Sequence, residues 1–238
     1  MNRLVRAELM KLRTVRSLLW VTLGMVALVG ISVISVVASS GVIENAGDDR
    51  SVARIASIAV VFSLILGIIV MGAEGTHGTI TQTFLVAPVR ERVVAAKAVV
   101  GVALGVALGV FAEALTLLVA VPGASLSVHN ARYVLVGVPI ACAAAGALGV
   151  GFGALYHRQG PAIVVALLWL LIAESVLAIG LHDNVRYLPG HVFAATVAGT
   201  RGSSSSDLVG AWSGAAGAAL YAVGFLAAGT ALLSRRDV

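Results

Sequence analysis

Residues 74–97 read EGTHGTITQTFLVAPVRERVVAAK and form a polar and basic island between two long apolar runs. The runs before and after it, at about 54–73 and 98–121, are each long enough to cross a bilayer, which takes about 20 mostly apolar residues in a helix. The island therefore predicts a loop on one side of a membrane, between two spanning helices. A charged loop of this kind is also a place where a soluble partner can bind a membrane protein.

The composition supports a membrane protein along the whole chain. Of the 238 residues, 59% are hydrophobic and only 11% are charged, whereas a soluble domain carries about 25% charged residues. The formal net charge of +5 does not indicate nucleic-acid binding, because the basic residues flank the apolar runs. They are better explained as topology signals near anionic lipid headgroups.

Six apolar runs predict six transmembrane helices, at about 18–38, 54–73, 98–121, 133–155, 161–181 and 208–233. No run shows the alternating pattern of a membrane β-barrel, and helices satisfy their own backbone hydrogen bonds in lipid. We therefore expect an all-α membrane protein with two parts, a cytosolic helix at 1–17 and a six-span domain at 18–238. The apolar part of the last loop, about 182–207, is expected to dip into the membrane or to lie on it, before a serine linker at 203–206.

The distribution of basic residues predicts that both termini lie in the cytoplasm. An even number of spans places both ends on one side, and basic residues favour the cytoplasmic side. With this orientation, eleven basic residues lie inside and five lie outside. The inside set is Arg3, Arg6, Lys11, Arg13, Arg16, Arg90, Arg92, Lys97, Arg158, Arg235 and Arg236, and the outside set is Arg50, Arg54, Arg132, Arg186 and Arg201.

The first 17 residues predict an interfacial amphipathic helix. Leu4, Val5, Leu9, Leu12 and Val15 share one side, while Arg3, Arg6, Lys11 and Arg13 share the other. Such a helix lies with its apolar side at the acyl boundary. Glu8 falls on the apolar side, where we expect a local ion pair with Lys11; contact with a partner protein is the alternative.

Two acidic residues lie inside predicted spans. A carboxylate within a bilayer costs about 2.5–3.5 kcal/mol on insertion scales, so it usually faces the bundle interior or water. Glu113 and Glu174 are therefore candidates for a translocation path or for an interhelical hydrogen bond.

Small residues at four-residue spacing mark close helix packing. They occur at Gly101, Gly105 and Gly109, at Gly149 and Gly153, and at Gly210 and Gly214. Packing within one subunit is the simpler explanation of each stripe, and a dimer interface or a sliding surface is the alternative.

The chain carries no phosphate-binding loop of its own. A P-loop needs G-x-x-x-x-G-K-[ST], because its lysine neutralises phosphate charge. The two lysines are Lys11, preceded by Glu-Leu-Met, and Lys97, preceded by Ala-Ala. The histidines show no metal-ligand spacing, so we expect no catalytic residue and no metal site.

The opening island itself predicts a short helix. Pro88 fits the first helical turn, where its missing N–H is not needed. Residues 89–97 then continue as a helix into span three, with Arg90, Arg92 and Lys97 at headgroup level. A solvated loop with snorkelling cations is the plain explanation, and a surface helix that docks on a soluble protein is the specific one.

The island resembles the inner loop of type-2 ABC transporter permeases. The resemblance rests on Glu74, Gly78-Thr79-Ile80, Thr83-Phe84-Leu85, Pro88, Arg90, Val93 and Ala96-Lys97. The segment 7–20 (AELMKLRTVRSLLW) and the closing Arg235-Arg236-Asp237 are also similar to bacterial members. The layout of the whole chain matches as well, with an amphipathic helix, six spans and a basic C-terminus.

The resemblance implies a permease of the plasma membrane that pairs with a second permease subunit, identical or different, and with separate ATP-binding subunits. This chain would bind no cofactor, and ATP-Mg would be held by the partner. The implied ATPase-coupling residues are Gly78, Thr83, Phe84, Pro88, Arg90 and Arg92. The function expected is the transmembrane subunit of an ATP-driven exporter; the alternatives are a non-transporting membrane scaffold or immunity protein and, disfavoured by the motifs, an intramembrane enzyme.

Overall fold

Helices account for nearly all of the chain that the structure describes, and this part contains no strand. The structure is a computed structural model that describes residues 2–12, 16–40, 46–76, 89–124, 128–156, 158–198 and 210–235. Apolar segments form helices because a helix satisfies every backbone N–H and C=O within the segment, which lipid cannot do.

The described residues form helical elements in the following order. They are α1 (Asn2–Leu12), α2 (Arg16–Ser40), α3 (Ala46–Ala53), η1 (Arg54–Ser57), α4 (Ile58–Thr76), α6 (Arg90–Ala124), α7 (Val128–Tyr156), α8 (Gln159–Leu168), η2 (Trp169–Ala173), α9 (Glu174–Leu181), η3 (His182–Tyr187), α10 (Pro189–Ala198) and α11 (Ala211–Arg235).

Six helical segments are long and apolar enough to cross a membrane: Arg16–Ser39, Asp49–Thr76, Arg90–Gly123, Ala131–Tyr156, Gln159–Leu181 and Ala211–Ser234. Each contains most of one predicted run, so the prediction of an all-helical chain with six helices long and apolar enough to span a membrane is confirmed for the described residues. The third segment begins at Arg90 and so includes the helical turns expected at 89–97. Pro88, where the short docking helix is expected to start, lies outside the described residues, so a separate short helix is not confirmed.

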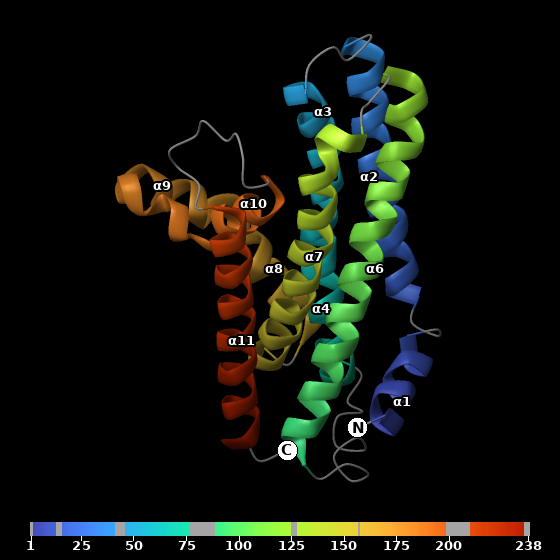
Figure 1. The fold of residues 1–238 in the computed structure, drawn as a ribbon. Helices are drawn as coiled ribbons and strands as arrows, with labels where there is room; N and C mark the ends of the chain where they lie inside the picture. The colour runs from blue at the N-terminus through green and yellow to red at the C-terminus, as the bar shows by residue number, and fades with distance from the viewer. Residues whose placement is uncertain are drawn as a thin grey trace.

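Helix α7 is the centre of the bundle. It packs against α4, α6, α11 and α10, whereas α2 covers the far side of α6 and α4. Figure 1 shows α2, α4, α6, α7 and α11 running along the long axis of the molecule. The outward faces of the helices leave large apolar side chains exposed, among them Trp20, Leu118, Ile179 and Leu220, as expected for surfaces that face lipid.

Glycines let the central helices approach closely. A Cβ atom at Gly105 would overlap the Cys142 carbonyl of α7, and one at Gly149 would overlap the Leu64 carbonyl of α4. Without a hydrophobic drive between helices in lipid, such close backbone approach is what holds them together.

The small-residue stripes of the third and fourth spans therefore pack inside one subunit, as the simpler explanation predicts. In the last stripe Gly214 packs on α10, whereas Gly210 meets only Ser213 of its own chain segment.

The fifth spanning segment is not one straight helix. The π-helical turn η2 separates α8 from α9, and α9 projects away from the bundle at the left of Figure 1. The chain then returns through η3 and enters α10. Gly214 of α11 lies against Thr196, Gly217 lies against Val192, and the Tyr221 hydroxyl donates to the Tyr187 carbonyl over 2.7 Å.

Helix α10 thus lies beside the first half of α11. Helix α11 itself is long and apolar enough to span a membrane. The apolar part of the last loop, in α10, therefore packs against the bundle. The serine run at 203–206 lies outside the described residues.

Helix α1 and the last turns of α11 lie at the same end of the bundle, at the bottom of Figure 1. This placement agrees with an even number of spans. We call this end the inner end, after the orientation expected from the basic residues, and the opposite end the outer end.

Candidate functional site: a buried charge cluster at the inner end

Four charged side chains from three helices meet at the inner end. Lys11 of α1 lies 2.9 Å from Glu8 Oε1 on its own helix and 2.7 Å from Glu74 Oε1 on α4. Lys97 of α6 lies 2.8 Å from Glu8 Oε2 and 3.1 Å from Glu74 Oε1. Its ammonium also donates to the Val70 carbonyl over 3.1 Å. We call Glu8, Lys11, Glu74 and Lys97 the charge cluster.

Each member is placed by the register of its helix. Glu8 and Lys11 are three residues apart on α1 and so share one face. Glu74 lies in the last turns of α4 and Lys97 in the second turn of α6. Because α4 and α6 run in opposite directions and pack together, these two positions reach the same level. Helix α1 folds across both.

The charge cluster is buried and neutral in sum. The side chain of Lys97 is 1% exposed and those of Glu8 and Glu74 are 10% exposed, while that of Lys11 is 48% exposed. Two ammonium groups offset two carboxylates. Burying ions costs several kcal/mol each unless charges and hydrogen bonds compensate, and removing one partner of such a set costs about 3–5 kcal/mol. The cluster therefore ties α1 firmly to α4 and α6.

Lys11 lies outside the spanning segments, and its pKa reports the electrostatics of the charge cluster. Partial burial lowers its pKa, but hydrogen bonds to Glu74 and Glu8 and the charges of both carboxylates outweigh burial. The pKa of Lys11 is therefore raised above the usual 10.5. The ammonium form is favoured throughout the physiological range.

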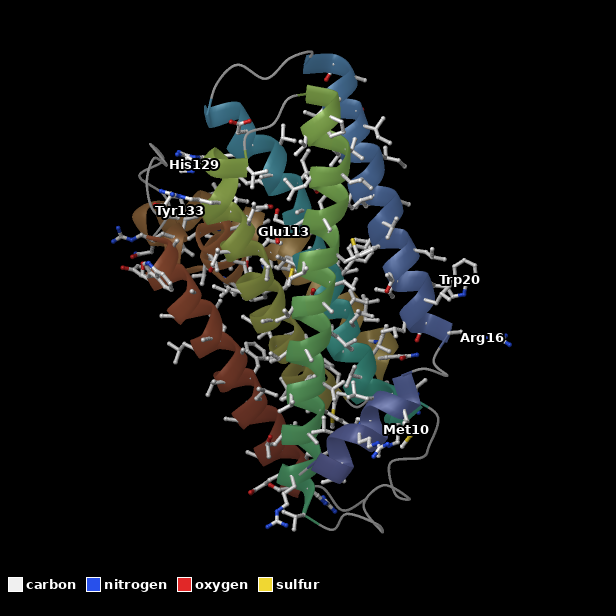
Figure 2. The ribbon with its side chains drawn as sticks, turned by 45° about the vertical axis from the view of Figure 1, so that its right-hand side comes forward. Met10, Arg16, Trp20, Glu113, His129 and Tyr133 are labelled. Atoms are coloured by element: carbon white, nitrogen blue, oxygen red, sulfur yellow. The ribbon has the colours of Figure 1, made fainter. Side chains whose placement is uncertain are left out.

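The sequence predicted part of this cluster. The local pair of Glu8 with Lys11 is confirmed. Lys97 is buried inside the bundle, because carboxylates from α1 and α4 converge on it and compensate its burial. Glu74 pairs with cations that are far away in the chain, which no local spacing reveals. On α1 the exposed Leu9 and Met10 face away from the bundle, as the Met10 label in Figure 2 shows.

The residues implied in ATPase coupling are only partly described. Gly78, Thr83, Phe84 and Pro88 lie outside the described residues. Arg90 donates from its guanidinium to the Leu233 carbonyl over 2.6 Å. This contact ties the start of α6 to the last turn of α11, where a cation also complements the helix dipole. Arg92 is exposed in the first turn of α6.

Glu113 lies in the centre of the bundle on α6, as Figure 2 shows. Its side chain is buried, and Oε1 has no hydrogen-bond partner within the described part of the chain. Cys142 of α7 lies close to it and beside Ser63 of α4. Glu113 is thus a buried polar group at the junction of three central helices.

Glu174 has a structural partner instead. Its carboxylate accepts a 2.7 Å hydrogen bond from the Gly190 N–H, and His191 Nδ1 lies 3.9 Å away. Gly190 is the second residue of α10, so Glu174 caps the start of that helix, where backbone N–H groups lack partners. The interhelical hydrogen bond that the sequence left open for Glu174 is therefore present.

Comparison with protein-family models finds no family that matches this chain, and comparison with curated proteins finds no significant match.

Proposed function

We propose that this chain is the transmembrane subunit of an ATP-driven exporter of the type-2 ABC class. In this proposal, separate ATP-binding subunits hold ATP-Mg, a second permease subunit completes the transporter, and both termini lie in the cytoplasm of a cell with the chain in its plasma membrane. The single observation that supports the coupling mechanism most is the charge cluster at the inner end.

The charge cluster joins the parts on which an external motor would act. Helix α4 ends at Thr76 and α6 begins at Arg90, so these helices flank the segment that resembles a coupling loop. Glu74 and Lys97 lie close to the two ends of that segment and both bind to α1. A force applied to the loop or to α1 would therefore reach both spanning helices together.

The lysines of the chain support an external motor. Lys97 is fully engaged by two carboxylates and a carbonyl, and Lys11 is bound by the same carboxylates. Neither follows the glycine-rich sequence that a phosphate-binding loop requires. Any ATP hydrolysis that drives this protein would then come from another polypeptide.

Charge reversal at Arg92 tests the proposal. Arg92 is exposed, so Arg92→Glu should leave the fold intact while it opposes binding of a subunit at the loop. Reversal removes an attraction and adds a repulsion of about 0.5–1 kcal/mol each, which lowers affinity by about tenfold. The measurement is the amount of P-loop ATPase that co-purifies from the native membrane, together with ATP hydrolysis by the complex.

The matched control is Arg132→Glu, an exposed arginine at the outer end of α7. It should leave co-purification unchanged. Equal recovery of the ATPase with both variants would remove the coupling role of this loop. Purification of the wild-type chain with no ATPase at all would instead favour a membrane scaffold.

A further inference from the structure

A long apolar cavity runs between α4, α7, α8, α10 and α11. Its volume is about 660 Å³, and it is lined by large apolar side chains such as Leu64, Leu148, Phe152, Phe193 and Phe225. Ligand sites in proteins have volumes of about 300–1,000 Å³ and mostly apolar walls. We call it the α7–α11 cavity.

The cavity is elongated along the bundle. Gly149 of α7 lies against the Leu64 carbonyl of α4, so these two residues mark one level. The lining extends seven residues outward along α4 to Ser57 and seven residues inward along α7 to Tyr156. At 1.5 Å per helical residue the cavity is about 20 Å long, more than one leaflet of a hydrocarbon core about 30 Å thick.

Part of the cavity wall is exposed. Phe193 and Val197 of α10 are buried, whereas Tyr156 at the inner end of α7 is 42% exposed and Trp169, just after the outer end of α8, is 43% exposed. Helices α8 and α11 both pack on α7 but make little contact with each other in the described part of the chain. The cavity therefore opens sideways, towards the membrane, between these two helices.

A hydrocarbon chain fits this space better than water does. A buried water needs two to four polar partners, and the walls supply few polar atoms. The opening faces the apolar part of the bilayer, because α8 and α11 both belong to segments apolar enough to span. The occupant available through that opening is a lipid chain.

A cation follows the inner end of the cavity lining in the chain. Arg158 follows Tyr156 by two residues, and its backbone N–H donates to the Tyr156 carbonyl over 2.7 Å. Its side chain is exposed. Basic pockets between helices on the cytoplasmic side bind anionic headgroups, and each arginine near the surface contributes to that attraction.

We propose that the α7–α11 cavity binds one acyl chain of an anionic phospholipid from the inner leaflet, with its headgroup phosphate on Arg158. The site goes beyond the proposed transporter function and does not depend on it. It relies on cavity shape, apolar walls and one cation, all within a single chain.

Trp169 offers a reporter inside the cavity. The other tryptophans, Trp20 and Trp212, are 70% and 75% exposed, so changing both to Phe leaves a single reporter. The protein is placed in zwitterionic bilayers, and phosphatidylglycerol with brominated chains is added at increasing mole fraction. A specific site gives quenching that saturates at low mole fraction, whereas lipid around the bundle gives quenching proportional to mole fraction.

Two pairs of variants identify the site. Ala194 lines the cavity and is exposed to it, so Ala194→Phe should fill the space and abolish the saturable phase. Ala107→Phe, on the exposed surface of α6, should leave it unchanged. Arg158→Gln should raise the midpoint about fivefold, which is the contribution of one arginine near an anionic surface, and Arg132→Gln at the outer end should not.

Quenching strictly proportional to mole fraction in the single-tryptophan protein would overturn the proposal. So would equal saturation by brominated phosphatidylcholine, or a midpoint that moves with Arg132 rather than Arg158. Because Arg158 is exposed, its variant tests the headgroup contact even if Ala194→Phe fails to fold. Loss of ATPase co-purification has no bearing on these readouts.

Discussion

Replacing Lys97 with Met should destabilise the folded protein, because it removes one cation of the charge cluster. Met keeps the unbranched four-atom stem of the lysine side chain and removes the ammonium that binds Glu8, Glu74 and the Val70 carbonyl. The charge cluster then holds two buried carboxylates and one ammonium. Removing one partner of a buried ion pair costs about 3–5 kcal/mol.

Lys11, the remaining cation, determines how much of this roughly 3–5 kcal/mol of unfolding free energy is lost. Lys11 still reaches both carboxylates, but its side chain is 48% exposed, so water screens part of its attraction. We expect Lys97→Met to lower the free energy of unfolding by about 3 kcal/mol. The measurement is reversible unfolding in mixed micelles of a mild and a denaturing detergent.

A second substitution separates charge from packing. Glu8→Gln combined with Lys97→Met restores neutrality, because Lys11 and Glu74 remain as one pair. The double variant should recover to within about 1 kcal/mol of the wild type, with an interaction energy of about 2 kcal/mol or more between the two sites. Arg92→Met, at an exposed position of the same helix, should change stability by less than about 0.5 kcal/mol.

Two results would refute this reasoning. A loss below about 1 kcal/mol for Lys97→Met would mean that the ammonium contributes little beyond its apolar stem. Strictly additive losses in the double variant would mean that Glu8 and Lys97 do not act as a pair.

Three further changes test separate parts of the structure. Because the pKa of Lys11 is raised above 10.5, the stability that its charge provides is present below about pH 10.4 and is lost as the pH rises through the raised pKa. An arginine stays charged at about pH 11, so Lys11→Arg should retain this stability. The measurement is Tm, which should drop less between about pH 9 and pH 11 in the variant than in the wild type. Glu174→Ala should cost about 1–2 kcal/mol by exposing the unbonded Gly190 N–H, whereas Glu174→Gln keeps an acceptor and should cost less; unfolding in mixed micelles separates them, and equal losses would contradict the capping role. Gly105→Ala should cost about 1–3 kcal/mol by pushing α6 from α7, while Gly224→Ala, where a Cβ meets open space, should cost nothing; the same assay compares them, and a neutral Gly105→Ala would show that these helices can separate freely.

The spanning helices could be predicted from the sequence because apolar length is a local property. The predicted run at 54–73 falls within the segment Asp49–Thr76, and the run at 98–121 falls within Arg90–Gly123. The residues of these segments that lie outside the predicted runs are the more polar ends of the same helices. The break at η2 gave no such signal, since residues 169–173 are as apolar as their neighbours.

The charge cluster could be predicted only within α1. Glu8 and Lys11 are neighbours on one helix, so their pairing follows from spacing. Lys97 and Glu74 join them because α1 folds across α4 and α6. Lys11 and Glu74 are 63 positions apart in the chain, and Glu8 and Lys97 are 89 positions apart. The same limit applies to Glu174, whose partner is a backbone N–H presented by a turn in the returning chain.

The bundle is held by two kinds of contact that differ in how they can change. At mid-depth, glycines place α4, α6 and α7 in close backbone contact, and a shift there would open voids or cause overlap. At the inner end, α1 is held mainly by ion pairs, with Val5 packed against the neighbouring apolar cluster. Ion pairs can exchange partners where packed backbones cannot.

The charge cluster can also divide without leaving a bare charge. Glu8 and Lys11 form a neutral pair within α1 at 2.9 Å, and Glu74 and Lys97 form a neutral pair between α4 and α6 at 3.1 Å. Of the ion pairs, withdrawal of α1 would break only the two that cross between these halves, Lys11 with Glu74 and Lys97 with Glu8. Since each half keeps its own counter-charge, the desolvation cost that makes an isolated buried ion prohibitive is not incurred. In the Lys97→Met variant every division leaves one carboxylate alone, so the same substitution that lowers stability should also prevent α1 from leaving and returning as a neutral unit.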